Sequence, residues 1–243
     1  MMNKDRIEAV AFDYYGTLVD AQQPFERIRE WFDWFLEING KYTRKLSDAF
    51  FMRFSRERAR LTCSAAFMPG HEILGQSYTA ACRRYRLPED PAGFHPLLYD
   101  IFTRPQAFDG AQALITSLRT RLRVGLITNA DNDILQQSIL RQGFLFDFVV
   151  TSEDARCCKP SPAIFERALK QLDLSADRLL MVGDSLTEDI MAANRCGIPA
   201  LFLNWRGQPA ECPQVGDLAQ LRKALNDCRS GIHSGTTGED ANA

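Results

Sequence analysis

Polar side chains follow four apolar runs of this chain, and each run has the composition of a buried strand. These polar residues are Asp13 with Thr17, Thr128 with Asn129, Lys159, and Asp184 with Asp189. In α/β folds the carboxyl ends of parallel strands meet at one edge of the sheet, where active sites lie. One carboxylate of this kind is a weak signal, but the four sets together predict one catalytic site at a sheet edge.

The residue types suit covalent catalysis by a carboxylate. An aspartate such as Asp13 can attack phosphorus or an electrophilic carbon and form an intermediate that water later hydrolyses. With a phosphate substrate, the charges of aspartate and phosphate have to be neutralised together. A Mg²⁺ ion held by Asp13, Asp184 and a backbone carbonyl would do this. Three carboxylates, those of Asp13, Asp184 and Asp189, would also repel one another unless a cation lies between them.

Other catalytic motifs are missing from the sequence. The segment 183–187 lacks the final glycine of a nucleophile elbow, and no Gly-x-x-x-x-Gly-Lys or Gly-x-Gly-x-x-Gly sequence occurs. His71 has no second histidine at metal-binding spacing, and the chain has three histidines in all. We therefore expect no histidine-based metal site, and we expect His71 and His95 to be ordinary residues of their segment.

Apolar runs that alternate with helical patterns predict the elements that position these residues. We expect strands at 7–12, 122–127, 146–151, 178–182 and 199–204. We expect helices at 111–120, 132–142, 162–172 and 188–196. Strands that alternate with helices imply right-handed crossovers and an α/β fold, with a parallel sheet and helices on both faces.

The segment 20–104 interrupts that alternation, because its aromatic residues recur at helical spacing and it contains no convincing strand. These aromatic residues include Phe25, Trp31, Phe32, Phe50 and Phe54. We expect them to pack against one another rather than to bind a ligand. The prediction is a helical insertion at 20–104, a core made of 1–19 and 105–228, and a disordered tail at 229–243.

The bulk composition is that of an ordinary globular protein. Of 243 residues, 45% are apolar and 25% are charged, and the net charge is −2. This balance does not indicate binding to nucleic acid or to an anionic membrane. The chain lacks a run of about 18 apolar residues, so no membrane span is expected, and we expect no signal peptide. Seven cysteines without paired spacing are typical of reduced thiols. We expect a cytoplasmic monomer or homodimer that acts on a small molecule.

The segment Asp13-Tyr14-Tyr15-Gly16-Thr17 resembles the first motif of the haloacid dehalogenase-like (HAD) hydrolases, which is usually Asp-x-Asp-x-Thr. The four polar sets stand in the order of the four motifs of that family, and the resemblance covers about residues 7–205. It implies a doubly wound, Rossmann-like α/β core with an inserted α-helical cap at 20–104.

The resemblance also implies a metal site. Asp13 would be the nucleophile and would hold Mg²⁺ together with Asp184 and the backbone carbonyl of Tyr15. Asp189 would orient the metal or its waters. Because Tyr15 contributes its carbonyl there, the loss of an aspartate side chain at this position need not destroy the metal site.

The same resemblance implies the residues that bind the substrate. Thr128 and Lys159 would bind the phosphoryl oxygens, and Lys159 would act in catalysis with Asp13 as a fixed positive charge. Thr17 and Asn129 complete this set, because backbone N–H groups of their loops lie in reach of an anion.

Tyr15 stands where the phosphatases of the family carry the aspartate that serves as general acid/base. The 2-haloacid dehalogenase branch reads Asp-x-Tyr-Gly-Thr instead, because a halide leaves without a proton. This likeness makes Tyr15 a candidate catalytic residue. That branch also uses a cap arginine near the halide and the substrate carboxylate. Arg44 stands at about the right place to bind a substrate, with an exposed surface charge as the alternative interpretation.

Two positions depart from the dehalogenase pattern. Leu186 stands where those enzymes carry an asparagine, and Phe165 stands where they carry a tyrosine. The segment 183–189, Gly-Asp-Ser-Leu-Thr-Glu-Asp, resembles the metal-binding motif of the nucleotidase and sugar-phosphatase branch. We therefore expect a Mg²⁺-dependent phosphatase that acts on a small phosphorylated metabolite. The alternatives are a 2-haloacid dehalogenase or another hydrolase of a carbon centre through an aspartyl ester, and a non-catalytic module that binds a phospholigand.

Overall fold

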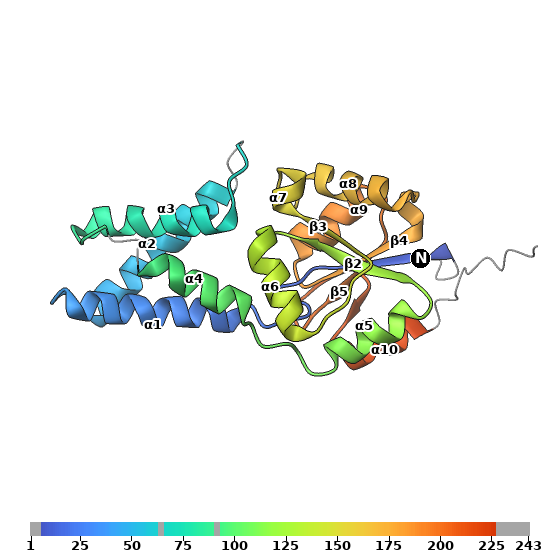
Figure 1. Cartoon of the computed structure of the whole chain (residues 1–243), viewed down its shortest axis with the longest axis horizontal. Helices are drawn as coiled ribbons and strands as arrows, with labels where there is room; N and C mark the ends of the chain where they lie inside the picture. The colour runs from blue at the N-terminus through green and yellow to red at the C-terminus, as the bar shows by residue number, and fades with distance from the viewer. Residues whose placement is uncertain (1–5, 63–65, 90–92, 227–243) are drawn as a thin grey trace, which may run out of the picture.

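Six parallel strands form one sheet in the core of the molecule (Figure 1). The computed structural model describes residues 6–62, 66–89 and 93–226. The strands lie in the order β3-β2-β1-β4-β5-β6. Their bounds are β1 Ala9–Phe12, β2 Arg123–Thr128, β3 Phe148–Thr151, β4 Leu179–Gly183, β5 Ala200–Leu203 and β6 Gln214–Val215. The predicted α/β fold with a parallel sheet is confirmed.

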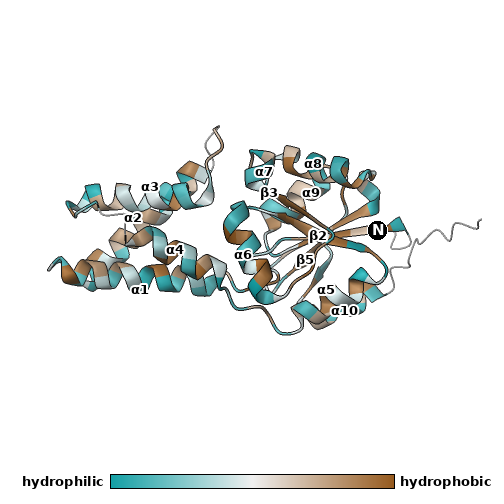
Figure 2. Cartoon of the chain, in the orientation of Figure 1, coloured by the Kyte–Doolittle hydropathy of each residue, from teal (hydrophilic) through white to brown (hydrophobic). Residues whose placement is uncertain are grey.

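Helices cover both faces of the sheet, so strands such as β1 are buried along their whole length. The first face packs against α5 Ala111–Arg119, α6 Asn132–Gln142 and α10 Leu218–Asn226. The opposite face packs against α8 Pro162–Leu172 and α9 Ala192–Arg195. In Figure 2 the strands are mainly hydrophobic, whereas the helices carry hydrophilic residues as well.

Four helices separate β1 from α5 along the chain and lie beside the sheet rather than on its faces (Figure 1). We call them the cap: α1 Gln22–Ile38, α2 Arg44–Thr62, α3 Gly70–Tyr85 and α4 Phe94–Thr103. They share their own cluster of buried side chains, in which Phe32, Phe50 and Phe54 are fully buried. The expectation that aromatic residues of this segment pack against one another is confirmed for these three.

The segment after β4 differs from the single helix expected at 188–196. Residues Leu186–Met191 form a π-helix, in which the Ile190 N–H donates to the Ser185 carbonyl at 3.2 Å, and α9 follows. Wide turns of this kind are frequent at functional sites. The short elements β6 and α7 Ser152–Ala155 were not predicted either, because two and four residues are too few to show a periodic pattern.

Two sequence expectations concern a tail and a membrane span. The predicted disordered tail, 229–243, lies outside the described residues. Among the helices of the described ranges, none combines the length and apolar character needed to cross a bilayer.

Candidate active site

Asp13 directly follows β1, a central strand of the sheet. Its backbone N–H donates to the Val182 carbonyl of β4 at 2.9 Å, so strand pairing continues to this residue and fixes its position. The carboxylate oxygen Oδ1 accepts hydrogen bonds from Thr128 Oγ1 at 2.9 Å and from Lys159 Nζ at 2.7 Å. The other oxygen, Oδ2, accepts no hydrogen bond from the described part of the chain.

Lys159 forms a buried ion pair with two aspartates. Its Nζ lies 2.7 Å from Asp13 Oδ1 and 2.5 Å from Asp189 Oδ1, and the Lys159 side chain is 2% exposed. Burial alone would lower the pKa of Lys159, but the charges of Asp13 and Asp189 outweigh burial and raise it. Lys159 therefore stays positively charged. The backbone N–H of Ser185 donates to Asp189 Oδ2 at 3.0 Å, so both oxygens of Asp189 are engaged.

Asp184 completes a cluster of three carboxylates. One oxygen each from Asp13, Asp184 and Asp189 lies within 4.8 Å of the others. Burial and the charge of Asp13 raise the pKa of Asp184 to about 6. Burial raises the pKa of Asp189 to about 7, although Lys159 acts in the opposite direction. One lysine faces three carboxylates, so near neutral pH the cluster is stabilised by a bound proton or by a further cation.

The donor set of this cluster fits a magnesium ion, which prefers carboxylate and carbonyl oxygens. Asp184 offers Oδ2, because Thr17 Oγ1 donates to its Oδ1 at 3.3 Å, and the Asp13 carboxylate lies beside it in the cluster. Asp189 is better suited to orient its neighbours than to bind an ion directly, since both of its oxygens already have partners. The structure thus brings together the three aspartates predicted to form the metal site.

Two of the predicted substrate-binding residues hold other residues in place. Thr17 is buried and donates to Asp184. Asn129 accepts the Lys159 N–H at 2.7 Å and donates to the Lys159 carbonyl at 3.2 Å. It also donates to Glu188 Oε2 at 3.2 Å. The side chain of Asn129 therefore fixes the loop that carries Lys159.

Tyr15 connects the core to the cap. Its hydroxyl donates to the Phe102 carbonyl in α4 at 2.8 Å, and its ring meets the Phe102 ring edge to face. Burial, followed by the charges of nearby groups, raises the pKa of Tyr15 well above its ordinary value. The hydroxyl proton thus points to a backbone carbonyl of the cap, and a catalytic role of the Tyr15 side chain stays a prediction.

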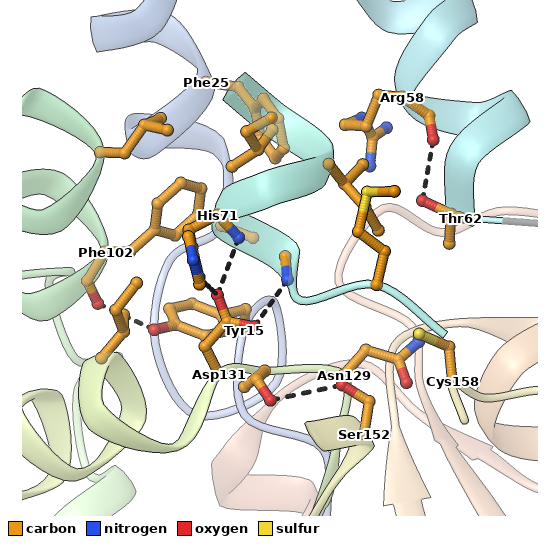
Figure 3. A pocket seen from close by; sticks show the side chains of 18 of the residues that line it. Tyr15, Phe25, Arg58, Thr62, His71, Phe102, Asn129, Asp131, Ser152 and Cys158 are labelled. Atoms are coloured by element: carbon orange, nitrogen blue, oxygen red, sulfur yellow. Dashed lines mark hydrogen bonds and ion pairs between the residues drawn. The ribbon is translucent and has the colours of Figure 1, made fainter. Parts of the chain in front are cut away.

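A pocket of about 300 Å³ lies between the cap and the residues that follow β1 and β2 (Figure 3). Its apolar lining includes Phe25, Met68, Ile73, Leu74, Leu98 and Phe102. Its polar lining includes Arg58, His71, Asn129, Ser152 and Glu188. The pocket adjoins the carboxylate cluster through two of its lining residues. Tyr15 lies two residues after Asp13, and Asn129 follows Thr128, which donates a hydrogen bond to Asp13.

Arg44 does not line this pocket. It begins α2, its side chain is 72% exposed, and it pairs with Asp48 one turn further along the same helix. The arginine of the pocket lining is Arg58, nearly four turns further along α2, whose guanidinium lies over the Phe25 ring at 5.1 Å. The exposure of the Arg44 side chain fits the alternative interpretation of Arg44 as a surface charge, and its contact with a substrate stays a prediction. Helix α2 does place an arginine at the pocket.

Asp131 and His71, which sequence reasoning did not assign to the site, join the core to the N-terminus of α3. Asp131 is 5% exposed and accepts the backbone N–H groups of Gly70 at 2.6 Å and of His71 at 2.8 Å. It also lies 2.9 Å from His71 Nδ1. No spacing in the sequence links positions 71 and 131, so only the docked cap shows this contact (Figure 3).

Gly16 is a position where a small change should disturb the cluster directly. Its φ is +94°, and an added Cβ would lie 2.5 Å from Asp184 Oδ2. We expect Gly16→Ala to lower the free energy of unfolding by about 1–3 kcal/mol and to reduce hydrolytic activity, because Asp184 has to move. Thermal unfolding and turnover of p-nitrophenyl phosphate and 2-chloropropionate measure the two effects.

Gly110→Ala is the matched control for Gly16→Ala. Gly110 has a φ of +83°, and nothing lies within 4 Å of an added Cβ. It therefore has the same kind of backbone strain without the clash with Asp184. Equal activity of the two variants would contradict the role given to the close approach of Gly16 and Asp184.

Comparison with known proteins shows the family to which the chain is similar. The model of the haloacid dehalogenase-like hydrolases matches residues 7–197. Glyceraldehyde 3-phosphate phosphatase of Pyrococcus abyssi is 32% identical over 82% of this chain and 82% of its own length. (S)-2-haloacid dehalogenase 4A of Burkholderia cepacia is 23% identical over 89% of this chain and 94% of its own length. Two other curated relatives, 36% and 35% identical, match over 51% and 55% of their own lengths, so the chain spans about half of each.

A solved structure shows the same fold. The magnesium-bound crystal structure of the HAD-hydrolase YfnB from Bacillus subtilis has a TM-score of 0.74 and 21% identity. The similarity covers 91% of this chain and 99% of that one. Because the family model matches residues 7–197, which are most of the chain, the chain belongs to the haloacid dehalogenase-like hydrolases.

Proposed function

We propose that this protein is a Mg²⁺-dependent phosphatase that uses Asp13 as its nucleophile and acts on a small phosphorylated metabolite. The observation that carries the proposal is the cluster of Asp13, Asp184 and Asp189, with oxygens within 4.8 Å of one another and one lysine between two of them. A phosphatase uses such an excess of negative charge to hold a cation beside the phosphate.

The residues divide the reaction among themselves. Asp13 Oδ2 has no hydrogen-bond partner among the described residues, so it attacks phosphorus. Oδ1 is held by Thr128 and Lys159, which fix the angle of the carboxylate. Lys159 also offsets the charge of the phosphoryl oxygens. Mg²⁺, held by Asp13 and Asp184, would neutralise the charge that Lys159 alone leaves uncompensated.

The pocket gives the class of leaving group. A volume of about 300 Å³ with apolar walls suits an organic group of modest size, and Arg58 and Glu188 offer two charges of opposite sign to its polar atoms. The expectation of a cytoplasmic monomer or homodimer is part of this proposal, since small phosphorylated metabolites are intracellular compounds.

Dehalogenation of a 2-haloacid is the second candidate, and Tyr15 is the observation that favours it. Two other positions, Phe165 and Leu186, count against dehalogenation. Phe165 is fully buried against the face of the sheet that α8 and α9 cover, and Leu186 packs against that same cluster. Neither side chain supplies the polar group that the resemblance to dehalogenases would require at its position.

One assay separates these candidates. We expect phosphate release from p-nitrophenyl phosphate in Mg²⁺, loss of this activity in EDTA, and its return when Mg²⁺ is added back. Chloride release from 2-chloropropionate is measured in parallel with and without metal.

The outcomes exclude one another. Metal-independent chloride release without phosphate release overturns the proposal and supports a dehalogenase. Binding of inorganic phosphate without turnover of either substrate, in wild type and in Tyr15→Asp, points to the non-catalytic module.

A further inference from the structure

We propose that His71, held by Asp131, is the general acid/base of this enzyme and replaces the aspartate that phosphatases of the family carry at position 15. The inference rests on the proposed phosphatase function. It assigns a catalytic role to a cap residue that the sequence presented as an ordinary histidine.

The need for such a group follows from Tyr15. An alkoxide leaving group has to receive a proton as its bond to phosphorus breaks, and a positioned acid typically contributes about 10²–10⁴-fold to the rate. The Tyr15 hydroxyl donates its proton to the Phe102 carbonyl at 2.8 Å. Another group near the leaving oxygen therefore has to provide the proton that the alkoxide receives.

The hydrogen bonds of Asp131 define the state of the His71 ring. The Asp131 carboxylate accepts two backbone N–H groups of α3 and lies 2.9 Å from His71 Nδ1. A carboxylate in this arrangement is an acceptor, so Nδ1 carries a proton and Nε2 is the nitrogen that exchanges one with a substrate. Histidine held by a buried carboxylate is a recurring arrangement in general acid/base catalysis.

The position of His71 matches the path of the leaving group. Asp13 follows β1 at the edge of the sheet, and phosphoryl transfer places the attacking and leaving oxygens roughly in line. The leaving oxygen therefore points away from Asp13, toward the pocket beneath the cap. His71 lines that pocket together with Tyr15 and Asn129, which adjoin the reacting residues in sequence (Figure 3). Its side chain is 44% exposed, so it is open to a ligand.

Titratable groups that line the pocket with His71 include residues from four parts of the chain. Asp131 precedes α6, Tyr15 follows β1, Arg58 is in α2, and Glu188 is in the π-helix after β4. The buried Asp131 carboxylate is the partner in direct contact with the ring, at 2.9 Å from Nδ1. Arg58 and Glu188 line the same pocket with opposite charges.

The proton balance of the two steps is as follows. Asp13 Oδ2 forms a bond to phosphorus, the bond from phosphorus to the leaving oxygen breaks, and His71 Nε2 gives its proton to that oxygen. Water then attacks phosphorus and loses a proton to the neutral Nε2, while the bond between phosphorus and Asp13 breaks. His71 returns to its protonated form, and inorganic phosphate leaves.

His71→Asn tests the inference with two substrates that differ in their leaving group. The asparagine amide keeps a donor near the position of Nδ1, so the contact with Asp131 is retained, but nothing replaces Nε2. We expect the kcat for n-butyl phosphate to fall by about 10²–10⁴-fold. The first-turnover burst of p-nitrophenolate from p-nitrophenyl phosphate should keep its rate, because p-nitrophenolate leaves without a proton, whereas later turnovers slow because water has lost its base.

His95→Asn is the matched control, because His95 is an exposed histidine of the cap that does not line the pocket. It should leave both rates unchanged, and thermal unfolding shows whether each variant is folded. A p-nitrophenolate burst that slows as much as turnover of butyl phosphate, or no loss with butyl phosphate, overturns the role of His71 while the phosphatase function stands. If the wild type hydrolyses neither phosphate ester, the proposed function fails, and the inference fails with it.

Discussion

Asp13→Asn is expected to lower the turnover of p-nitrophenyl phosphate by at least about 10³-fold, because the amide cannot attack phosphorus. The substitution keeps the size of the side chain and an oxygen for Thr128 and Lys159, so the fold should persist. Initial rates at saturating substrate and Mg²⁺ give the effect on kcat. Mass spectrometry of acid-quenched samples should show one added phosphoryl group in the wild type and none in the variant.

Asp109→Asn is the control for Asp13→Asn. Asp109 is exposed in the turn before α5, away from the carboxylate cluster, so the same loss of charge there should leave turnover unchanged. Full activity of Asp13→Asn would show that the covalent mechanism is wrong. Loss of activity together with loss of the cooperative thermal transition would indicate a folding defect, and the mass measurement on the wild type would then decide.

The fold was largely predictable because the strands are buried on both faces. Continuous apolar runs such as β1 and β4 identify themselves in the sequence, and each predicted strand overlaps an observed one. The helix α10 escaped prediction although Leu218, Leu221 and Leu225 recur at helical spacing and are buried, so its signal was present. The π-helix after β4 was not predictable, because its wider turn depends on how Ser185 and Asp189 bond to each other in the folded chain.

The site residues that directly follow strands could be predicted from the sequence, whereas the contacts between the cap and the core could not. Asp13, Thr128 and Lys159 meet because neighbouring strands place them at one edge. The contact of His71 with Asp131 joins residues 60 positions apart. It depends on the angle at which α3 approaches α6, which no local pattern encodes. Helical spacing alone likewise does not say which turn of α2 faces the pocket, where Arg58 lies and Arg44 does not.

Tyr15 illustrates how one substitution can change the division of labour in a site. An aspartate at this position would place an acid beside the phosphate. The tyrosine places a ring and a hydroxyl there, and the hydroxyl binds the cap at Phe102. The bonds that join core and cap thus include that of Tyr15 with Phe102 and those of Asp131 with the start of α3. We propose that His71, held by Asp131, carries out the proton transfer that an aspartate at position 15 would perform.

Lys159→Met is expected to lower the free energy of unfolding by about 3–5 kcal/mol at pH 8, because it leaves buried carboxylates without their cation. Methionine has a similar length and fits the space of the lysine stem. Lys170→Met is the control, since Lys170 is an exposed lysine of α8. Chemical denaturation of both variants in EDTA gives the difference.

The pH dependence of the Lys159→Met deficit identifies its cause. In the wild type, burial raises the pKa of Asp189 from 3.8 to about 7, so the folded state holds this proton more tightly than the unfolded chain does. Such a group contributes most to stability below its unfolded pKa, and the contribution is lost as the pH rises toward the folded pKa. Removal of Lys159 raises the folded pKa of Asp189 further, so the loss of unfolding free energy should be small at pH 5 and grow toward pH 8.

Added Mg²⁺ should recover part of the stability of Lys159→Met at pH 8, since it replaces the missing positive charge. A deficit that is the same at both pH values would mean that Lys159 stabilises the fold by packing alone, and the electrostatic account of the cluster would be wrong.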